Sequence, residues 1–508
     1  MLAKVYSVAH IGLISVSVEV EVDVASLGFP SFNIVGLPSK AVEEAKERVK
    51  TAIVNTGCSF PQKKITVNLA PADLAKEGSC YDLPIALGIL LASGEIAANG
   101  QLDNAIVYGE LSLDGTVRHT KGVLLVGIFA QRNRYKKVFV PKNSSREAAV
   151  IDGIQVLPVI NLASLIAHLT GIKKIKPASK VIIDKLMRDA DSEFDFSEVL
   201  GQEQAKRALT IAAAGSHNIL MSGPPGSGKT MLARALPGIL PPLTSKEALE
   251  VTRIYSAIGL LSPGESIVSI RPFRFPHHSS SLVGLIGGGS KPMPGEISLA
   301  HLGVMFLDEM AEFPRSVLES MRQPMEDGKV VISRAAGRIE YPAVFLLVAA
   351  VNPCPCGYLN HPKRQCQCSL RQIERYKRRI SGPILDRIDL FINVPFVEAE
   401  KLEGSSPDTS KEIRKRVLSA RQIQTERFAS YQNIYTNSQM KNKHVKLFCQ
   451  LNEEGKKLMR LAVEKHALST RSYFRILKIA RTIADLNNEK NIKLEHLAEA
   501  LQYRMRVF

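Results

Sequence analysis

Hydrophobic and polar residues alternate near the start of the chain and give way to continuous apolar runs further along. Residues 14–24 (ISVSVEVEVDV) carry apolar side chains at every second position, which predicts a half-buried strand. Short apolar runs at 219–221, 304–307 and 343–351 predict three more buried strands. Towards the C-terminus the period becomes helical, as in residues 476–484. The pattern therefore predicts mixed α/β segments followed by a helical region.

The run at 219–221 is followed by the sequence GPPGSGKT and then by a helical pattern from Met231. Between a strand and a helix, such a loop turns backbone N–H groups onto phosphate oxygens, while its lysine neutralises the β- and γ-phosphates. The threonine hydroxyl is placed to ligate Mg²⁺. A surface turn rich in glycine and proline is the alternative. We therefore predict a nucleoside triphosphate site formed by Gly223, Pro224, Pro225, Gly226, Ser227, Gly228, Lys229 and Thr230.

Polar residues follow the other two apolar runs and supply the chemistry for hydrolysis. Asp308 and Glu309 end the run at 304–307, so we expect Asp308 to hold Mg²⁺ and Glu309 to act as the base that polarises water. Asn352 follows the run at 343–351, where its amide would reach the γ-phosphate or the attacking water. Taken singly, each is also compatible with an ordinary strand end.

The order of motifs along the chain is more specific than any one of them. The motifs are VLGQ at 199–202, AKRAL at 205–209, GPPGSGKT at 223–230, FLDE at 306–309, Asn352, LDRID at 385–389 and STR at 469–471. This order resembles AAA+ ATPases of the magnesium-chelatase-like branch. Within that branch the chain most resembles the ComM (YifB) type, a group implicated in DNA branch migration during bacterial natural transformation. The resemblance covers nearly the whole chain.

The resemblance implies a fold, an assembly and three residue roles. It implies an ATP- and Mg²⁺-dependent homo-hexamer in which Asn352 is the first sensor and Arg471 the second. Arg387 would be the arginine finger that acts on the ATP of a neighbouring subunit, so hydrolysis would depend on assembly. The expected domains are a Lon-protease-like (ribosomal S5-like) α+β domain at 1–168, a basic linker at 169–193, an AAA+ P-loop α/β core at 194–400 and a basic helical lid at 401–508.

The N-terminal domain resembles the protease domain of Lon but lacks the residues of its serine–lysine dyad. Alignment of KEGSCYD with the Lon pattern places Cys80 at the nucleophile position. The second half of the pattern places Leu124 where an amine is needed to accept the proton. A dyad of Ser79 and Lys121 is the alternative. We expect a proteolytically silent domain.

Four of the seven cysteines fall in one short segment, as two CxC pairs. Four thiolates on two arms suit tetrahedral Zn²⁺, and in a reducing compartment a metal site is favoured over disulfides. His361 is an alternative ligand, and free thiols are the alternative to metal. The predicted zinc ligands are Cys354, Cys356, Cys366 and Cys368.

A hairpin with a small-residue tip is predicted over residues 325–339. It resembles the hairpin that hexameric helicases of this clade project into their pore, with Arg334 and Arg338 on its arms. Cations in a pore contact phosphates whatever the base sequence. Lys291, in the glycine-rich segment 285–291, is the second candidate for a DNA contact.

Charge and composition narrow the class of partner. The net charge is +17, and residues 411–508 hold 21 lysines and arginines against nine aspartates and glutamates, or +12. An anionic partner is expected, with single-stranded or branched DNA first, alongside recombination proteins. The alternative is a chelatase-like ATPase that remodels a protein partner. No uncharged apolar stretch exceeds that at 83–94, so neither membrane nor export signal is predicted and a cytoplasmic location is expected.

Overall fold

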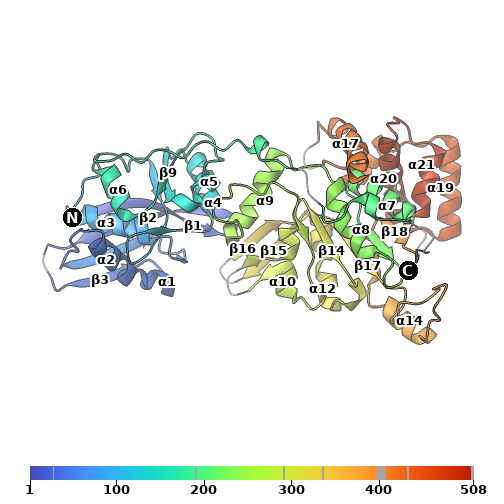
Figure 1. The fold of residues 1–508 in the computed structure, drawn as a ribbon, viewed down its shortest axis with the longest axis horizontal. Helices are drawn as coiled ribbons and strands as arrows, with labels where there is room; N and C mark the ends of the chain where they lie inside the picture. The colour runs from blue at the N-terminus through green and yellow to red at the C-terminus, as the bar shows by residue number, and fades with distance from the viewer. Residues whose placement is uncertain are drawn as a thin grey trace. The chain divides into compact units, whose positions relative to one another are not determined.

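The computed structural model describes residues 1–26, 28–188, 192–289, 292–334, 337–397, 408–431 and 434–504, with the side chain of Arg334 excepted. The chain divides into two compact units (Figure 1). The first comprises Met1–Met187 and Thr244–Ser269, and the second comprises Arg188–Leu243 and Ile270–Phe508. Residues 244–269 lie in sequence within the expected core and pack with the N-terminal unit, while the expected linker is divided between the two units and the expected core and lid share one unit.

The first unit is built on a four-stranded sheet of order β1-β2-β4-β3. Strand β2 is the alternating segment, and its alternation is confirmed because Val18, Val20 and Val22 are fully buried. Strands β1 and β2 pair as an antiparallel hairpin from Leu2 opposite Asp23 to Ile11 opposite Ile14. The strands are β1 (Leu2–Ile11), β2 (Ile14–Val24), β3 (Ser31–Val35) and β4 (Lys64–Ala70).

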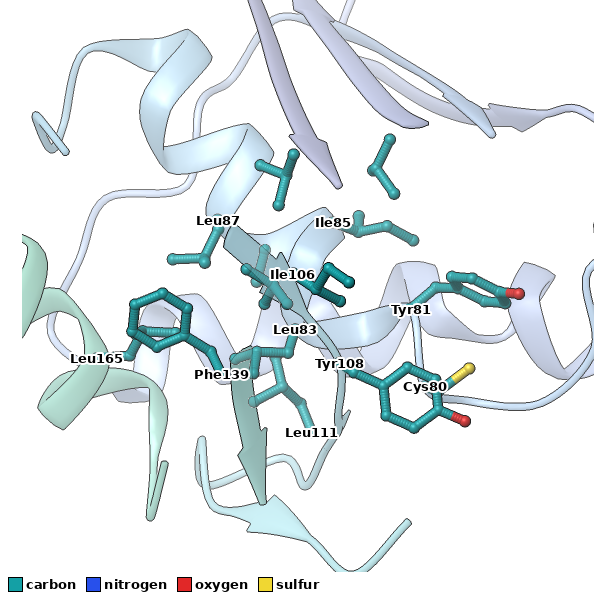
Figure 2. Packing of buried hydrophobic residues seen from close by; sticks show 14 of the residues in the cluster. Cys80, Tyr81, Leu83, Ile85, Leu87, Ile106, Tyr108, Leu111, Phe139 and Leu165 are labelled. Atoms are coloured by element: carbon teal, nitrogen blue, oxygen red, sulfur yellow. The ribbon is translucent and has the colours of Figure 1, made fainter. Parts of the chain in front are cut away.

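Among the described residues of this unit, two smaller sheets and seven α-helices accompany the first sheet. Helix α3 is buried along nearly its whole length, and Figure 2 shows its Leu83 and Ile85 packed near Ile106 of β5. The small sheets contain β5 (Ala105–Val107), β8 (Lys137–Pro141) and β9 (Gln155–Val159), and β6 (Glu110–Leu111) and β7 (Val117–Arg118). The helices are α1 (Lys40–Glu43), α2 (Ala45–Asn55), α3 (Asp82–Ser93), α4 (Val123–Arg132), α5 (Ser145–Ala148), α6 (Leu162–Leu169) and α9 (Ser245–Ile258).

The second unit contains a five-stranded parallel sheet of order β11-β14-β17-β10-β18. The three predicted apolar strands are confirmed as β10, β14 and β17, and every residue in them is buried. Because the strands are parallel, their carboxyl ends meet at one edge, where ligands bind in open α/β sheets. The strands are β10 (Ile219–Ser222), β11 (Phe273–Arg274), β14 (Val304–Leu307), β17 (Leu346–Val351) and β18 (Leu390–Asn393).

Helices lie around this sheet (Figure 1), and among the described residues two hairpins belong to the same unit. The hairpin predicted over residues 325–339 is present with later bounds, because β15 (Lys329–Arg334) pairs antiparallel with β16 (Gly337–Pro342) and residues 325–327 belong to helix α13 (Arg322–Asp327). A shorter hairpin joins β12 (Gly287–Gly288) to β13 (Met293–Pro294). The α-helices are α7 (Glu203–Gly215), α8 (Lys229–Ala235), α10 (Leu282–Ile286), α11 (Glu296–Leu299), α12 (Arg315–Ser320), α13 (Arg322–Asp327), α14 (Leu370–Lys377) and α15 (Gly382–Leu385).

The C-terminal part of the second unit is helical, as its apolar period predicts. Ile476, Ile479 and Ile483 lie on the buried face of α20 and join the core that also covers β10 and β17. The helices are α17 (Ser410–Arg427), α18 (Asn442–Phe448), α19 (Glu453–His466), α20 (Thr470–Leu486) and α21 (Leu494–Gln502). Among the described residues, none of the helices combines the length and apolarity needed to span a membrane.

Candidate nucleotide site

The glycine-rich loop connects β10 to α8 at the carboxyl edge of the parallel sheet. Gly226 and Gly228 have φ angles of 77° and 87°, a region that glycine enters without steric cost. At Gly223, an added Cβ would lie 2.2 Å from the Val394 carbonyl oxygen, so the loop passes directly against the end of β18. Gln202 braces the same loop, because its amide donates to the Ser227 and Pro395 carbonyls at 3.2 and 2.8 Å.

Lys229 begins α8, and its amine is turned back into the loop. It donates to the carbonyls of Gly223 and Pro224, both at 2.8 Å. Burial lowers the pKa of Lys229 to about 8, against the opposing effect of the negative charges of Asp308 and Glu309. The loop therefore holds a desolvated cation that a polyphosphate would neutralise.

Two acidic residues follow β14 within reach of α8. The Thr230 hydroxyl donates to an Asp308 carboxylate oxygen at 2.7 Å, which brings together the two side chains predicted to share Mg²⁺. Glu309 has a φ of 49°, which is uncommon outside glycine. Such strained backbone often occurs at functional positions.

A histidine that the sequence analysis did not consider lies beside Glu309. The Nδ1 atom of His278 is 3.7 Å from a Glu309 carboxylate oxygen. His278 follows β11, whose end lies at the same edge of the sheet as that of β14. His278 could have been predicted as a polar residue that follows a third parallel strand. That strand, β11, has only two residues and therefore gives no apolar run in the sequence.

Asn352 immediately follows β17 and lies beside the glycine-rich loop. Its side-chain oxygen lies 3.5 Å from the Lys229 amine. Gly223, Lys229, Asp308 and Asn352 thus gather at one sheet edge, and the arrangement can bind a triphosphate and a divalent cation. Their catalytic roles stay predictions.

The two arginines with predicted roles both approach one carboxylate. Arg387 is buried and forms an ion pair with Glu326 on α13, and it donates to the Pro383 carbonyl at 2.5 Å. Arg471 is exposed at the start of α20, 3.9 Å from the same carboxylate. For Arg387 to reach a neighbour's nucleotide, its contact with Glu326 would have to open.

The four cysteines of the two CxC pairs converge. The Sγ atoms of Cys354, Cys356 and Cys366 are 3.4 to 3.7 Å apart, and all four sulfurs lie within 4.8 Å of one another. Hydrogen bonds from backbone N–H groups, that of Tyr358 first, lower the pKa of Cys356 to about 6. His361 is not among the residues whose ligand atoms gather here, and its Nδ1 accepts from two backbone N–H groups at 3.0 Å.

The predicted DNA contacts are only partly described. Arg338 is exposed on β16 and pairs with Glu340 at 3.2 Å. Lys291 and the side chain of Arg334 lie outside the described residues. The hairpin is therefore present, and its proposed contacts stay predictions.

Near the Lon-like motif, the described residues form a packed core. Cys80 is buried beside Tyr108 (Figure 2), and burial raises the pKa of its thiol to about 12. Ser79 donates to Glu110, and Leu124 packs against Val150 and Ile151. These surroundings are compatible with the prediction that the N-terminal domain has no working serine–lysine dyad.

A groove lined by four arginines and Glu312, which no sequence motif predicted, lies beside the segment that follows Asp308 and Glu309. Arg371, Arg375 and Arg378 are exposed at positions i, i+4 and i+7 of α14 and its last turn, so they share one helical face. No ion pair joins Arg371 or Arg375 to a carboxylate in the part of the chain that is described. Arg375 and Arg378 also line a groove of about 440 Å³ with Arg315 and Arg379. The signal was the run from Lys363 to Arg379, with seven lysines and arginines against one glutamate.

Comparison with known proteins places the chain in one protein family. Models of magnesium chelatase match in three places, namely subunit ChlI of Mg-chelatase at residues 20–144, magnesium chelatase subunit ChlI at 195–402 and the ChlI C-terminal region at 407–504. Competence protein ComM of Haemophilus influenzae is 44% identical over 100% of this chain and 98% of its own length. YifB of Escherichia coli K12 is 42% identical over 99% and 97%. The magnesium-chelatase 38 kDa subunit of Rhodobacter capsulatus is 27% identical over 32% of this chain and 50% of its own.

Proposed function

Because the chain belongs to the magnesium-chelatase family and is of the ComM type, we propose that it is an ATP-driven motor on DNA. The family is of the AAA+ ATPase type, which implies ATP and Mg²⁺. The proposed motor is a homo-hexameric helicase that moves branched DNA during natural transformation. The name of the Haemophilus relative, a competence protein, supports that setting.

The nucleotide site supplies the groups that hydrolysis needs. Bound Mg²⁺ would neutralise charge on the phosphates, and Thr230 and Asp308 are the residues that would hold it. Lys229 would leave the loop carbonyls for the β- and γ-phosphates. Glu309 would orient and deprotonate the attacking water, with Asn352 fixing that water or the γ-phosphate.

The observation that carries the DNA assignment is the arginine-lined groove along α14. Arg371 and Arg375 have no described carboxylate partner, and such a face binds phosphates without regard to base sequence. The groove is also lined by Glu312 and Phe313, which follow Glu309 by only three and four residues. A strand bound there would therefore contact the segment that carries the catalytic base.

DNA-stimulated ATP hydrolysis tests the proposal. Single-stranded DNA should raise the hydrolysis rate well above the rate given by a sequence-free polyanion such as heparin. The variant with Arg371, Arg375 and Arg378 all changed to Gln should lose most of this stimulation. Its binding to single-stranded DNA should also depend less steeply on salt, by about two units of slope, since each lost phosphate contact removes roughly 0.7.

A matched variant separates a specific surface from overall charge. Arg132, Arg134 and Lys136 are exposed in the N-terminal unit, and changing all three to Gln removes the same charge. This control should keep its stimulation and its salt slope. Equal losses in both variants would exclude the α14 face as the binding surface. A rate of ATP hydrolysis that does not change when DNA is added would instead favour the chelatase-like alternative, an ATPase that remodels a protein partner.

A further inference from the structure

We propose that Cys354, Cys356, Cys366 and Cys368 hold one Zn²⁺ and that this ion fixes the loop that braces the phosphate-binding loop. The family assignment and the proposed motor activity do not require this site. It concerns a second ion, distinct from the Mg²⁺ that accompanies ATP. Its consequence is that the nucleotide site depends on the zinc ion.

The spacing of the sulfurs fits a tetrahedral tetrathiolate site. Four sulfurs each about 2.3 Å from a central ion lie roughly 3.8 Å apart. In the structure, the Sγ atoms of Cys354, Cys356 and Cys366 are 3.4, 3.7 and 3.6 Å apart in pairs. A disulfide would need a separation of about 2.0 Å, and the seven cysteines are all free thiols in this structure. Three of the four sulfurs are therefore close to the distance that a shared ion requires, and the sulfur of Cys368 lies within 4.8 Å of each of them.

The loop between the two arms packs on the phosphate-binding loop. Gly357 follows the first pair directly, has a φ of 82°, and donates to the Cys354 carbonyl at 3.0 Å. A Cβ at Gly357 would lie 2.5 Å from Cδ of Pro225. The backbone at Gly357 thus lies against the ring of a residue of the GPPGSGKT sequence, with no room for a side chain.

The ends of the cysteine segment lead into two other parts of the site. Cys354 lies two residues after Asn352, and Cys368 immediately precedes Ser369, which caps α14. The hydroxyl of the buried Tyr376 on α14 is hydrogen-bonded to the backbone of Asn352. An ion at the four sulfurs would therefore tie the Asn352 strand, the phosphate-binding loop and the basic helix to one another.

Metal content of the full-length chain tests the first half of the proposal. Protein purified without chelators should contain one zinc ion per chain by elemental analysis. Cobalt exchanged into the site should give the intense absorption of tetrahedral cobalt–thiolate bonds. The variant with Cys354 and Cys366 changed to Ser should lose both signals, and Cys58→Ser should lose neither. Absence of zinc together with absence of a cobalt–thiolate spectrum, or disulfides within residues 354–368, would overturn the site.

Nucleotide affinity tests the second half. Wild-type chain stripped of zinc under reducing conditions, then freed of chelator and supplied with Mg²⁺, should bind ATP roughly tenfold more weakly, and added zinc should reverse the loss. This measurement decides the matter even if the cysteine variant does not fold. Unchanged affinity in the stripped chain would overturn the coupling.

One variant separates the contact from the metal. Gly357→Ala keeps all four sulfurs, so it should retain zinc and still lose ATP affinity. Gly264→Ala is the matched control, because Gly264 also has a positive φ, of 89°, but an added Cβ meets nothing within 4 Å. If the Gly357→Ala variant has normal zinc content and normal ATP affinity, the contact between Gly357 and Pro225 does not couple the zinc site to the nucleotide site.

Discussion

At the scale of single residues, Lys229 gives the nucleotide site a predictable response to pH. Burial lowers the pKa of Lys229 to about 8 in the empty site. Above that pH the free protein has lost the charge that a triphosphate needs, so binding must take up a proton. The ATP affinity of the wild-type chain should therefore fall as pH rises through 8, by at most about tenfold per unit.

Equilibrium binding of ATP between about pH 7 and pH 9 measures this effect. Lys229→Arg is the informative comparison, since arginine keeps its charge throughout that range. Whatever its absolute affinity, this variant should show no decline with pH. A wild-type affinity that stays flat across the range would contradict the lowered pKa.

The residues of the nucleotide site differ in how visible they are in the sequence. Lys229 lies in a spaced motif and Asp308 follows a fully buried apolar strand of four residues, so the sequence is sufficient to bring them together. His278 could not be found in this way, because β11 is too short to give a periodic signal. The contact of Gly357 with Pro225 depends on how two loops fold against each other, and no local pattern records it.

At the scale of elements, helix α9 is held in the first unit by a buried carboxyl group. Glu147 on α5 accepts a hydrogen bond from the Ser256 hydroxyl on α9 at 2.7 Å. Burial raises the pKa of Glu147 to about 7, against the opposing effect of that hydrogen bond. The folded state thus favours the protonated form, whose stabilisation is complete below the unfolded pKa and is lost as pH rises through 7.

Glu147→Gln should therefore stabilise the chain at about pH 9, by on the order of 3 kcal/mol, and have little effect near pH 4. An amide copies the neutral acid and still accepts the hydrogen bond from Ser256. Urea unfolding of the full chain at several pH values measures the difference, with the exposed Glu43→Gln as control. A Glu147→Gln profile that runs parallel to wild type at all pH values would refute the assignment.

Helix α9 also shows why the order of elements in the sequence did not predict which unit each element packs in. The sequence predicts helices and strands from periodicity, and the hairpin β15–β16 and the helical C-terminal region appeared where expected. The place of α9 depends instead on tertiary contacts such as that of Leu249 with the cluster around Leu124. Leu249 lies 98 to 125 positions from the three buried residues of that cluster, a separation that periodicity does not register.

At the scale of the whole molecule, the ion pair between Arg387 and Glu326 allows a catalytic role of Arg387 to be distinguished from a structural one. The test compares variants at the two positions. If Arg387 completes the nucleotide site of a neighbouring subunit, Arg387→Ala should cost on the order of 10³ in hydrolysis and spare ATP binding. Glu326→Gln removes only the partner in the same chain and should keep most of the activity. Equal losses in both variants would indicate that the ion pair serves folding.

Mixing of inactive variants tests whether the site is shared between subunits. Lys229→Ala lacks the cation that binds phosphate, and Arg387→Ala lacks the group supplied to the neighbour. Combined in one assembly, they should restore part of the hydrolysis rate, because some interfaces then hold both residues. If the mixture is no more active than its parts, the shared site is refuted.

The most direct test of the central claim is ATP-driven migration of a four-way DNA junction. The wild-type chain should move the junction only with ATP and Mg²⁺. Glu309→Gln should bind both ATP and the junction but leave it in place, because only the catalytic base is missing. Lys229→Ala should fail at the earlier step of binding ATP. A wild-type chain that hydrolyses ATP rapidly in the presence of a bound junction, and never moves it, would contradict the account.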